Sequence, residues 1–174
     1  MTTEEIRNAA KGGKICALTG HRNLKGDIAA GDIEEKIELL ISQGYTLFLC
    51  GMALGFDTEC CRILYSLRKK YDIGVIACIP FSGQEFKFSP LQKEIYRQYV
   101  DESDGKVILS PYYKTGCYFE RNRFMVDACD ALLAYLREEK GGTYYTVKYA
   151  KSKNKNILYL SLIHISEPTR HLRI

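Results

Sequence analysis

Two patterns of apolar and polar residues, one typical of strands and one typical of helices, alternate along the chain. Short runs of mostly apolar or β-branched residues are typical of buried strands, and they occur at residues 14–19, 45–50, 73–79, 106–109, 130–136 and 157–159. Between them, apolar residues recur every three or four positions, as on one face of a helix. This helical spacing covers residues 32–43, 58–71, 90–99, 118–129 and 141–150.

Strands that alternate with helices predict a parallel sheet, because each connection between parallel strands must cross over a face of the sheet. We therefore expect an α/β fold, a three-layer Rossmann-like domain with a mostly parallel sheet. Residues 1–159 have a length that suits one such domain. Ligands of these folds lie at the carboxyl ends of the strands, near the point where the strand order reverses.

The stretch from Phe48 to Asp57 has the features of an anion site at a strand end. Phe48 and Leu49 lie at the end of a predicted strand, Gly51 and Gly55 allow tight turns and a close approach of the backbone, and Asp57 is placed to cap the next helix. The first amides of a helix lack internal partners and lie at the positive end of its dipole, so a phosphate or carboxylate is favoured there. The alternative is that the glycines only serve the turn.

A second glycine-bearing turn repeats this design later in the chain. Gly141, Gly142 and Thr143 follow the predicted strand at residues 130–136 and open the next helix. The glycines would admit a ligand to the backbone, and the threonine would donate a hydroxyl group.

The first predicted strand also ends in a loop with ligand-binding chemistry. Thr19 offers a hydroxyl group, Gly20 permits close approach, and His21 can donate to a ligand oxygen. Arg22 offers a planar fork that suits phosphate. The alternative is an ordinary surface loop whose histidine satisfies a backbone carbonyl. Three strand ends of this kind together predict a pocket.

Aromatic residues in the middle of the chain leave two interpretations open. The two phenylalanines of residues 82–89 either form a wall over a site or, as we favour, shield the core. Tyr112 and Tyr113 either stack on a base or cover the edge of the core.

The cysteines favour neither a metal site nor a disulfide framework. There are seven, an odd number, without C-x-x-C spacing, and most lie in apolar segments. We expect buried free thiols in a reducing compartment, with Cys60 and Cys61 as a redox pair the alternative.

Composition and charge exclude other classes. No apolar run approaches the roughly 20 residues of a membrane span, and residues 2–14 are too polar for a signal peptide. We expect a soluble cytoplasmic protein that does not bind membranes. The net charge of +4 is too small to indicate a nucleic-acid partner by itself.

Several of these motifs, taken in order, resemble one superfamily. Residues 51–57, 121–123 and 142–143, followed by Thr146 and Ala150, resemble the Rossmann-like core of the Smf/DprA proteins. Residues 120–125, 130–131 and 141–143 are similar to the LOG cytokinin-activating phosphoribohydrolases. With residues 19–22 in front and Gln84 after Pro80 and Phe81, the chain most resembles the YpsA-like branch of this SLOG superfamily, over residues 14–159.

The resemblance implies a pocket for a nucleotide or a nucleotide-derived ligand such as ADP-ribose, in a sensor or regulatory module. No other cofactor is implied. Arg121, Asn122 and Arg123 join the predicted ligand-binding residues through their motif. The two arginines lie two positions apart on a helix and so point about 200° apart. Both can therefore face one phosphate only if the start of the helix is irregular. The alternative is that one of them is a structural ion-pair partner of Glu120 or Asp127.

The departures from these families bear on activity. The resemblance to LOG-type hydrolases implies a catalytic glutamate three residues after Thr143, but that position holds Thr146 in this chain. A threonine cannot act as a carboxylate acid or base. We therefore favour binding over catalysis. The alternatives are a LOG-like nucleoside monophosphate phosphoribohydrolase and a DprA-like protein that binds single-stranded DNA. Related folds also suggest a homodimer.

The sequence changes character near its end. Residues 160–170, Leu-Ser-Leu-Ile-His-Ile-Ser-Glu-Pro-Thr-Arg, resemble the translation of a transposase sequencing adapter. We therefore expect residues 160–174 to be a non-native tail, and we give their histidines and arginines no functional weight.

Overall fold

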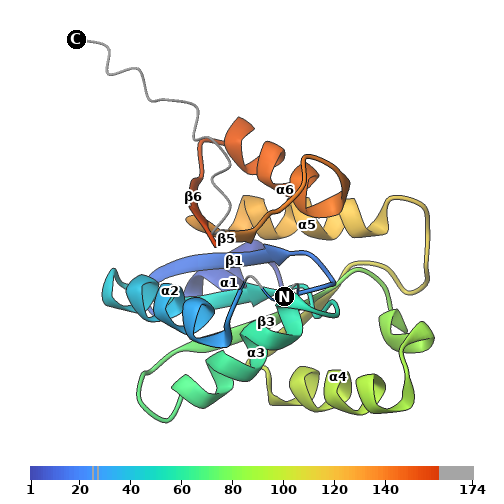
Figure 1. The fold of residues 1–174 in the computed structure, drawn as a ribbon, viewed down its shortest axis with the longest axis horizontal. Coiled ribbons are helices and arrows are strands. Elements are labelled where there is room, and N and C mark those ends of the chain that lie inside the picture. Colours follow the sequence, from blue (N-terminus) through green and yellow to red (C-terminus); the bar gives the residue numbers. More distant parts are fainter. Residues whose placement is uncertain (25, 27, 161–174) are drawn as a thin grey trace.

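A computed structural model describes residues 1–24, 26 and 28–160, so the expected tail lies outside the described residues except for Leu160. Six strands form one sheet in the order β4-β3-β2-β1-β5-β6, and every neighbouring pair is parallel (Figure 1). The strands are β1 (Lys14–Gly20), β2 (Tyr45–Cys50), β3 (Gly74–Ile79), β4 (Gly105–Ile108), β5 (Ala131–Tyr135) and β6 (Asn156–Tyr159).

Helices connect the strands and cover both faces of the sheet (Figure 1). They are α1 (Thr3–Ala9), α2 (Ala30–Ser42), α3 (Phe56–Leu67), the 3₁₀ helix η1 (Gln84–Lys87), α4 (Pro90–Glu102), α5 (Cys117–Ala128) and α6 (Gly141–Ser152). The predicted Rossmann-like α/β fold is thus confirmed, and the sheet is parallel throughout.

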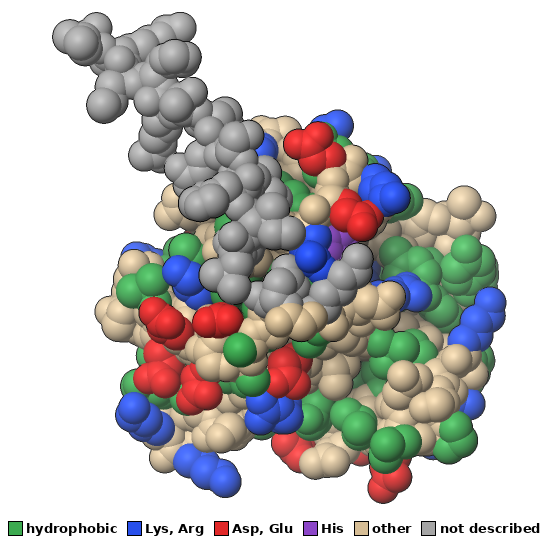
Figure 2. Space-filling model, viewed as in Figure 1, with side chains coloured by type: hydrophobic (Ala, Val, Ile, Leu, Met, Phe, Trp, Pro, Cys, Tyr) green, Lys and Arg blue, Asp and Glu red, His purple; other side chains and the backbone are tan. Residues whose placement is uncertain are grey.

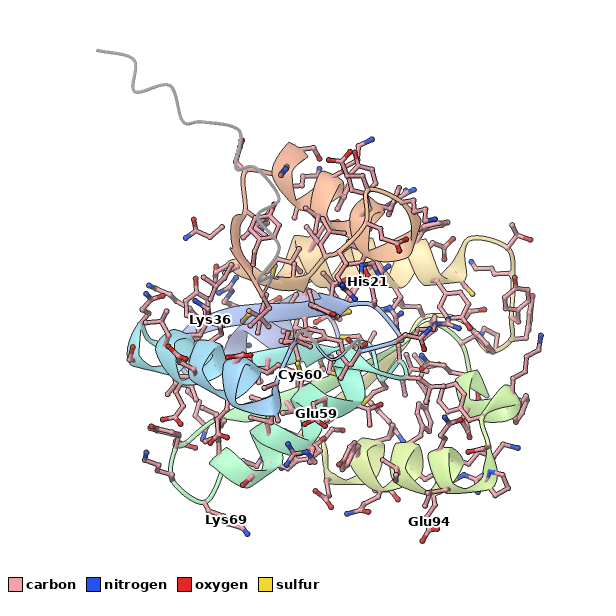
Figure 3. All side chains as sticks on the ribbon, in the orientation of Figure 1. His21, Lys36, Glu59, Cys60, Lys69 and Glu94 are labelled. Carbon is pink, nitrogen blue, oxygen red and sulfur yellow. The ribbon has the colours of Figure 1, made fainter. Side chains whose placement is uncertain are left out.

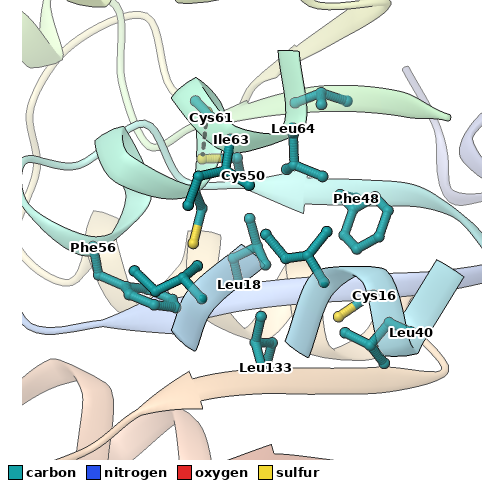
Figure 4. Packing of buried hydrophobic residues seen from close by; sticks show 14 of the residues in the cluster. Cys16, Leu18, Leu40, Phe48, Cys50, Phe56, Cys61, Ile63, Leu64 and Leu133 are labelled. Atoms are coloured by element: carbon teal, nitrogen blue, oxygen red, sulfur yellow. Dashed lines mark hydrogen bonds between the residues drawn. The ribbon is translucent and has the colours of Figure 1, made fainter. Parts of the chain in front are cut away.

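Two apolar clusters lie on opposite faces of the sheet. On one face α2 and α3 pack on residues such as Phe48, and on the other α1, α5 and α6 pack on residues such as Leu49. Figure 4 shows the first cluster, including Cys50 and Cys61, whose sulfur atoms lie 3.2 Å apart. All seven cysteines are buried free thiols, as predicted.

The differences from the predicted elements lie mainly at their ends. The predicted helix at residues 58–71 begins earlier, at Phe56, and ends at Leu67. Helix α1 was not predicted, because it buries a single residue, Ile6, and therefore shows no repeated apolar spacing in the sequence. Its capping box, in which Thr2 and Glu5 bond each other's backbone amides, is the signal that would have identified it.

The strand order reverses between β1 and β5. From β1 the chain moves through α2 to β2 on one side, whereas from β5 it moves through α6 to β6 on the other. The loops that leave β1 and β5 therefore diverge at the carboxyl ends of two adjacent strands. A crevice at this point is the general ligand site of open parallel sheets.

Candidate functional site

A cleft of about 370 Å³ lies where the strand order reverses. The end of β1, the loops after β1 and β2, helix α5 and the first turns of α3 and α6 line it. It brings together most of the residues that the sequence predicts for a ligand site. The lining residues are Leu18, Thr19, Gly20, His21, Arg22, Gly51, Ala53, Asp57, Tyr118, Arg121, Asn122, Met125, Gly142 and Thr143.

Arg121 reaches into the cleft from α5 and is held by the backbone of two strand ends. The side chain is 5% exposed, and its Nη1 donates to the carbonyl groups of Gly51 and Cys78. Its Nε donates to Oδ1 of Asn122 at 2.8 Å. A Cβ atom on Gly51 would lie 2.6 Å from Arg121 Nη1, so the glycine makes room for the guanidinium group.

Asp57 does not cap α3, which corrects the sequence-based prediction. The N-cap is Gly55, and Asp57 lies within the first turn of the helix. Its Oδ2 accepts the amide of Ala53 at 3.2 Å and braces the loop after β2. Burial raises the pKa of the Asp57 carboxyl to about 6, although the positive charges of Arg121 and Arg22 act in the opposite direction.

Gly55 does not line the cleft, and the structure gives a different reason for a glycine there. Its φ angle is +82°, and an added Cβ atom would lie 1.9 Å from the carbonyl oxygen of Arg22. Only a glycine lets the turn after β2 pack on the loop after β1.

The loop after β1 is tied to its surroundings by backbone and ring contacts. Gly20 packs on Phe56, whose ring atoms would lie 2.4 Å from an added Cβ atom. His21, labelled in Figure 3, accepts the amide of Arg137 on its Nε2 at 2.9 Å. That nitrogen is therefore an acceptor here and not the donor that the sequence suggested. Thr19 is 8% exposed and lies at the cleft wall.

The start of α6 faces open space. Among the described residues, no side chain caps this helix, and none lies within 4 Å of a Cβ atom placed on Gly141 or Gly142. The first amides of a helix have no partner within it, so those of α6 remain available to a ligand. Thr143 lines the cleft, whereas Thr146 donates its hydroxyl to the carbonyl of Gly142 at 2.8 Å.

Arg123 and Gly141 do not line the cleft. Arg123 is exposed, and its Nε donates to the hydroxyl of Tyr145 on α6 at 2.6 Å. The two arginines of α5 thus diverge, as their spacing predicts. Neither Glu120 nor Asp127 is the hydrogen-bond partner of Arg123. Glu120 instead forms an ion pair with Lys114, and Asp127 accepts a hydrogen bond from the hydroxyl of Tyr149.

A second, aromatic compartment of about 540 Å³ adjoins the cleft, and the sequence had left open whether its aromatic side chains form a site. It shares Arg22, Ala53 and Tyr118 with the cleft. Tyr113 lines it and Tyr112 does not, and the phenylalanines of residues 82–89 form its wall, contrary to the core role that we favoured. The remaining lining residues are Leu54, Phe81, Gly83, Gln84, Phe86, Lys87 and Phe88.

Within the part of the chain that the structure describes, no group of three histidine, cysteine, aspartate or glutamate side chains is arranged to hold a metal ion. Among the helices of the same residues, none is both long and apolar enough to span a membrane.

Comparison with known proteins identifies relatives by sequence. A model of the YspA SLOG family matches residues 20–167. A UPF0398 protein of Bacillus velezensis is 27% identical over 156 residues, which cover 82% of this chain and 86% of the relative. The UPF0398 protein YpsA of Bacillus subtilis is 25% identical over 143 residues, which cover 75% of this chain and 79% of the relative.

Two solved structures share the fold. DprA of Streptococcus pneumoniae superposes with a TM-score of 0.66 at 18% identity, over 90% of this chain and 53% of that one, so this chain spans about half its length. DprA of Helicobacter pylori, a single-stranded DNA binding protein, gives a TM-score of 0.61 at 20% identity, over 88% of this chain and 68% of that one.

Proposed function

This chain belongs to the YspA SLOG family, and from that premise we propose that it binds a nucleotide or nucleotide-derived ligand as a sensor or regulatory module. The observation that carries the proposal is the uncapped start of α6, which opens onto a cleft at the point where the strand order reverses. Such a helix start favours a phosphate group.

The charges in the cleft suggest how the parts of a nucleotide would be distributed. The amides at the start of α6 and the hydroxyl of Thr143 would receive the phosphate, with Arg22 at the rim as a further donor. Asp57 would repel a phosphate but can accept hydrogen bonds from ribose hydroxyl groups. We therefore place the phosphate near α6 and the ribose near the start of α3.

Binding without hydrolysis is the reading that we favour. The position expected to carry a catalytic glutamate holds Thr146, whose hydroxyl is used within α6. A LOG-like hydrolase would release free base from a nucleoside monophosphate, which chromatography detects directly. We expect no release above background, and turnover that is lost in Asp57→Asn would make the protein an enzyme.

Two threonines on α6 provide a matched test of the binding site. Thr143→Val removes a hydroxyl that lines the cleft, and Thr146→Val removes one that is bonded within the helix. Calorimetric titration with the four ribonucleoside monophosphates and ADP-ribose should detect binding that Thr143→Val weakens about tenfold, as the loss of a hydrogen bond to a charged group implies. Thr146→Val should leave the affinity unchanged. Failure of all these nucleotides to bind contradicts the proposal.

Single-stranded DNA is the second candidate, because the two structural neighbours are DprA proteins and one of them binds it. The exposed aromatic side chains of this chain are of the kind on which bases stack. Phosphate contacts with DNA release counterions, so binding should fall steeply with salt. With a net charge of +4, we expect little binding at physiological salt, and tight binding there would favour DNA as the ligand.

The expected homodimer remains a prediction, and sedimentation of the purified protein checks it.

A further inference from the structure

We propose that the aromatic compartment beside the cleft is a subsite that stacks the planar base of the ligand. This inference rests on the proposed function, since it extends a nucleotide from the phosphate-binding cleft into the neighbouring compartment. The compartment, of about 540 Å³, is contiguous with the cleft through the side chains that both share. Its volume falls within the roughly 300–1,000 Å³ of small-molecule pockets.

The wall of the compartment is built from rings at fixed angles. Phe81 is 9% exposed, and the rings of Tyr113 and Tyr118 meet it edge-on at centroid distances of 5.4 and 5.9 Å. Phe81 thus anchors two tyrosines that reach outward. Edge-to-face contacts of this kind favour a defined ring orientation. The compartment therefore presents ordered aromatic surfaces.

These aromatic surfaces are partly uncovered. Phe86 is 72% exposed and Tyr113 is 62% exposed. In Figure 2, hydrophobic side chains gather on the side of the molecule that Figure 1 shows to be formed by η1, α4 and the loop before α5. Large apolar side chains gathered at a hollow of the surface mark a binding site.

Gln84 supplies the observation that selects a base over an aliphatic partner. The side chain is 5% exposed, and its Nε2 donates to the carbonyl of Gly51 at 3.1 Å. Its Oε1 is buried, and it has no hydrogen-bond partner in the described part of the chain. A buried acceptor without a partner is costly, and the N–H groups on the edge of a nucleobase would satisfy it. An aliphatic side chain or lipid tail would leave it unpaired.

Arg22 and Tyr118 stand at the junction of the two compartments. The guanidinium carbon of Arg22 lies 5.7 Å from the centroid of the Tyr118 ring, and that of Arg121 lies 5.9 Å from it. Positive charge therefore lies beside an aromatic face where the ligand would pass from one compartment to the other. This juxtaposition suits a molecule that is anionic at one end and aromatic at the other.

Two adjacent tyrosines allow a matched test. Tyr113 lines the compartment, and Tyr112 is similarly exposed, at 68%, but does not line it. Titrations of wild type, Tyr113→Ala and Tyr112→Ala would use the four ribonucleoside 5′-monophosphates and ribose 5-phosphate, which has no base. We expect Tyr113→Ala to weaken the bound nucleotides at least about fivefold and to leave ribose 5-phosphate unchanged. Tyr112→Ala should change neither. Phe86→Ala, at another exposed position, provides the same test should Tyr113→Ala fail to fold.

The outcomes separate the two proposals. If Thr143→Val weakens nucleotide binding but Tyr113→Ala and Phe86→Ala do not, the phosphate cleft stands and the base subsite is wrong. If wild type binds none of the nucleotides, the proposed function fails and the subsite fails with it. If oligothymidylate binds and the mononucleotides do not, the small-ligand proposal is likewise overturned in favour of DNA.

Discussion

The two glycine-bearing turns, after β2 and after β5, have the same design in sequence but different surroundings. In the first, the space beside Gly51 holds the Arg121 guanidinium, and the space beside Gly55 holds the backbone of Arg22. In the second, no residue of the described part of the chain lies within 4 Å of a Cβ atom on Gly141 or Gly142. The first turn is thus packed by other parts of the protein, whereas no described residue fills the space beside the second.

A glycine turn at a strand end is therefore not evidence of an anion site by itself. The group that fills the space beside Gly51 comes from Arg121, which is 70 residues away in the sequence. Local sequence cannot reveal such a neighbour. Substitutions at the two turns should therefore separate folding from binding.

Gly55→Ala should have the largest effect on stability. A side chain at φ +82° is strained, and the added atom would meet the Arg22 carbonyl oxygen at 1.9 Å. We expect the free energy of unfolding to fall by at least about 3 kcal/mol, measured by urea denaturation. A loss below about 1 kcal/mol would show that the turn has room and would weaken the contrast between the turns.

Asp57→Asn tests the buried charge of the packed turn. The folded-state pKa of about 6 lies above the ordinary value of 3.8, so the folded protein binds the proton more tightly than the unfolded chain does. The carboxyl therefore destabilises the fold above pH 6, and this penalty is relieved as the pH falls towards 4. Between pH 4 and 8, wild type should lose about 2 kcal/mol relative to the variant. If the difference in the free energy of unfolding between wild type and Asp57→Asn stays constant from pH 4 to 8, the pKa of Asp57 is not raised in the folded protein.

Gly51→Ala should have a smaller effect of the same sign. The added Cβ atom would lie 2.6 Å from Arg121 Nη1 and 3.0 Å from Asp57 Oδ2, so the guanidinium group must move from its carbonyl partners. We expect a loss of about 1 to 2 kcal/mol in the free energy of unfolding. An unchanged midpoint of denaturation would mean that Arg121 adjusts freely.

Gly142→Ala should have the smallest effect on stability, and it should raise the free energy of unfolding, whereas the substitutions at Gly55 and Gly51 lower it. No described residue lies within 4 Å of the added atom, the φ angle of Gly142 is not positive, and the residue is in the first turn of α6. Alanine should stabilise the protein by about 0.5 kcal/mol. The added methyl group would nevertheless narrow the open cleft, so nucleotide binding should weaken. If calorimetry instead shows unchanged affinity, the ligand does not approach this turn.

The sequence predicted the fold well because its strands are continuous apolar runs, which the parallel sheet buries on both faces. It predicted the divergence of Arg121 and Arg123 from helix geometry, but not that Arg121 is the one that faces the cleft, because Tyr145 on α6 holds the other. The sequence left the role of the aromatic residues undecided, because Phe81 and Tyr113 come from separate loops and only the fold brings their rings together.

Binding of a nucleotide phosphate at the start of α6 can be tested by titrating the isotope-labelled protein with the tightest-binding ribonucleoside monophosphate and recording the NMR shifts of the backbone amides. We predict the largest shifts at the amides of Gly142 and Thr143, where α6 opens onto the cleft, with little change at Gly55. Thr143→Val should reduce these shifts at the same nucleotide concentration. If the largest shifts occur at Gly55, or if none occur at the start of α6, the nucleotide does not bind at this helix start.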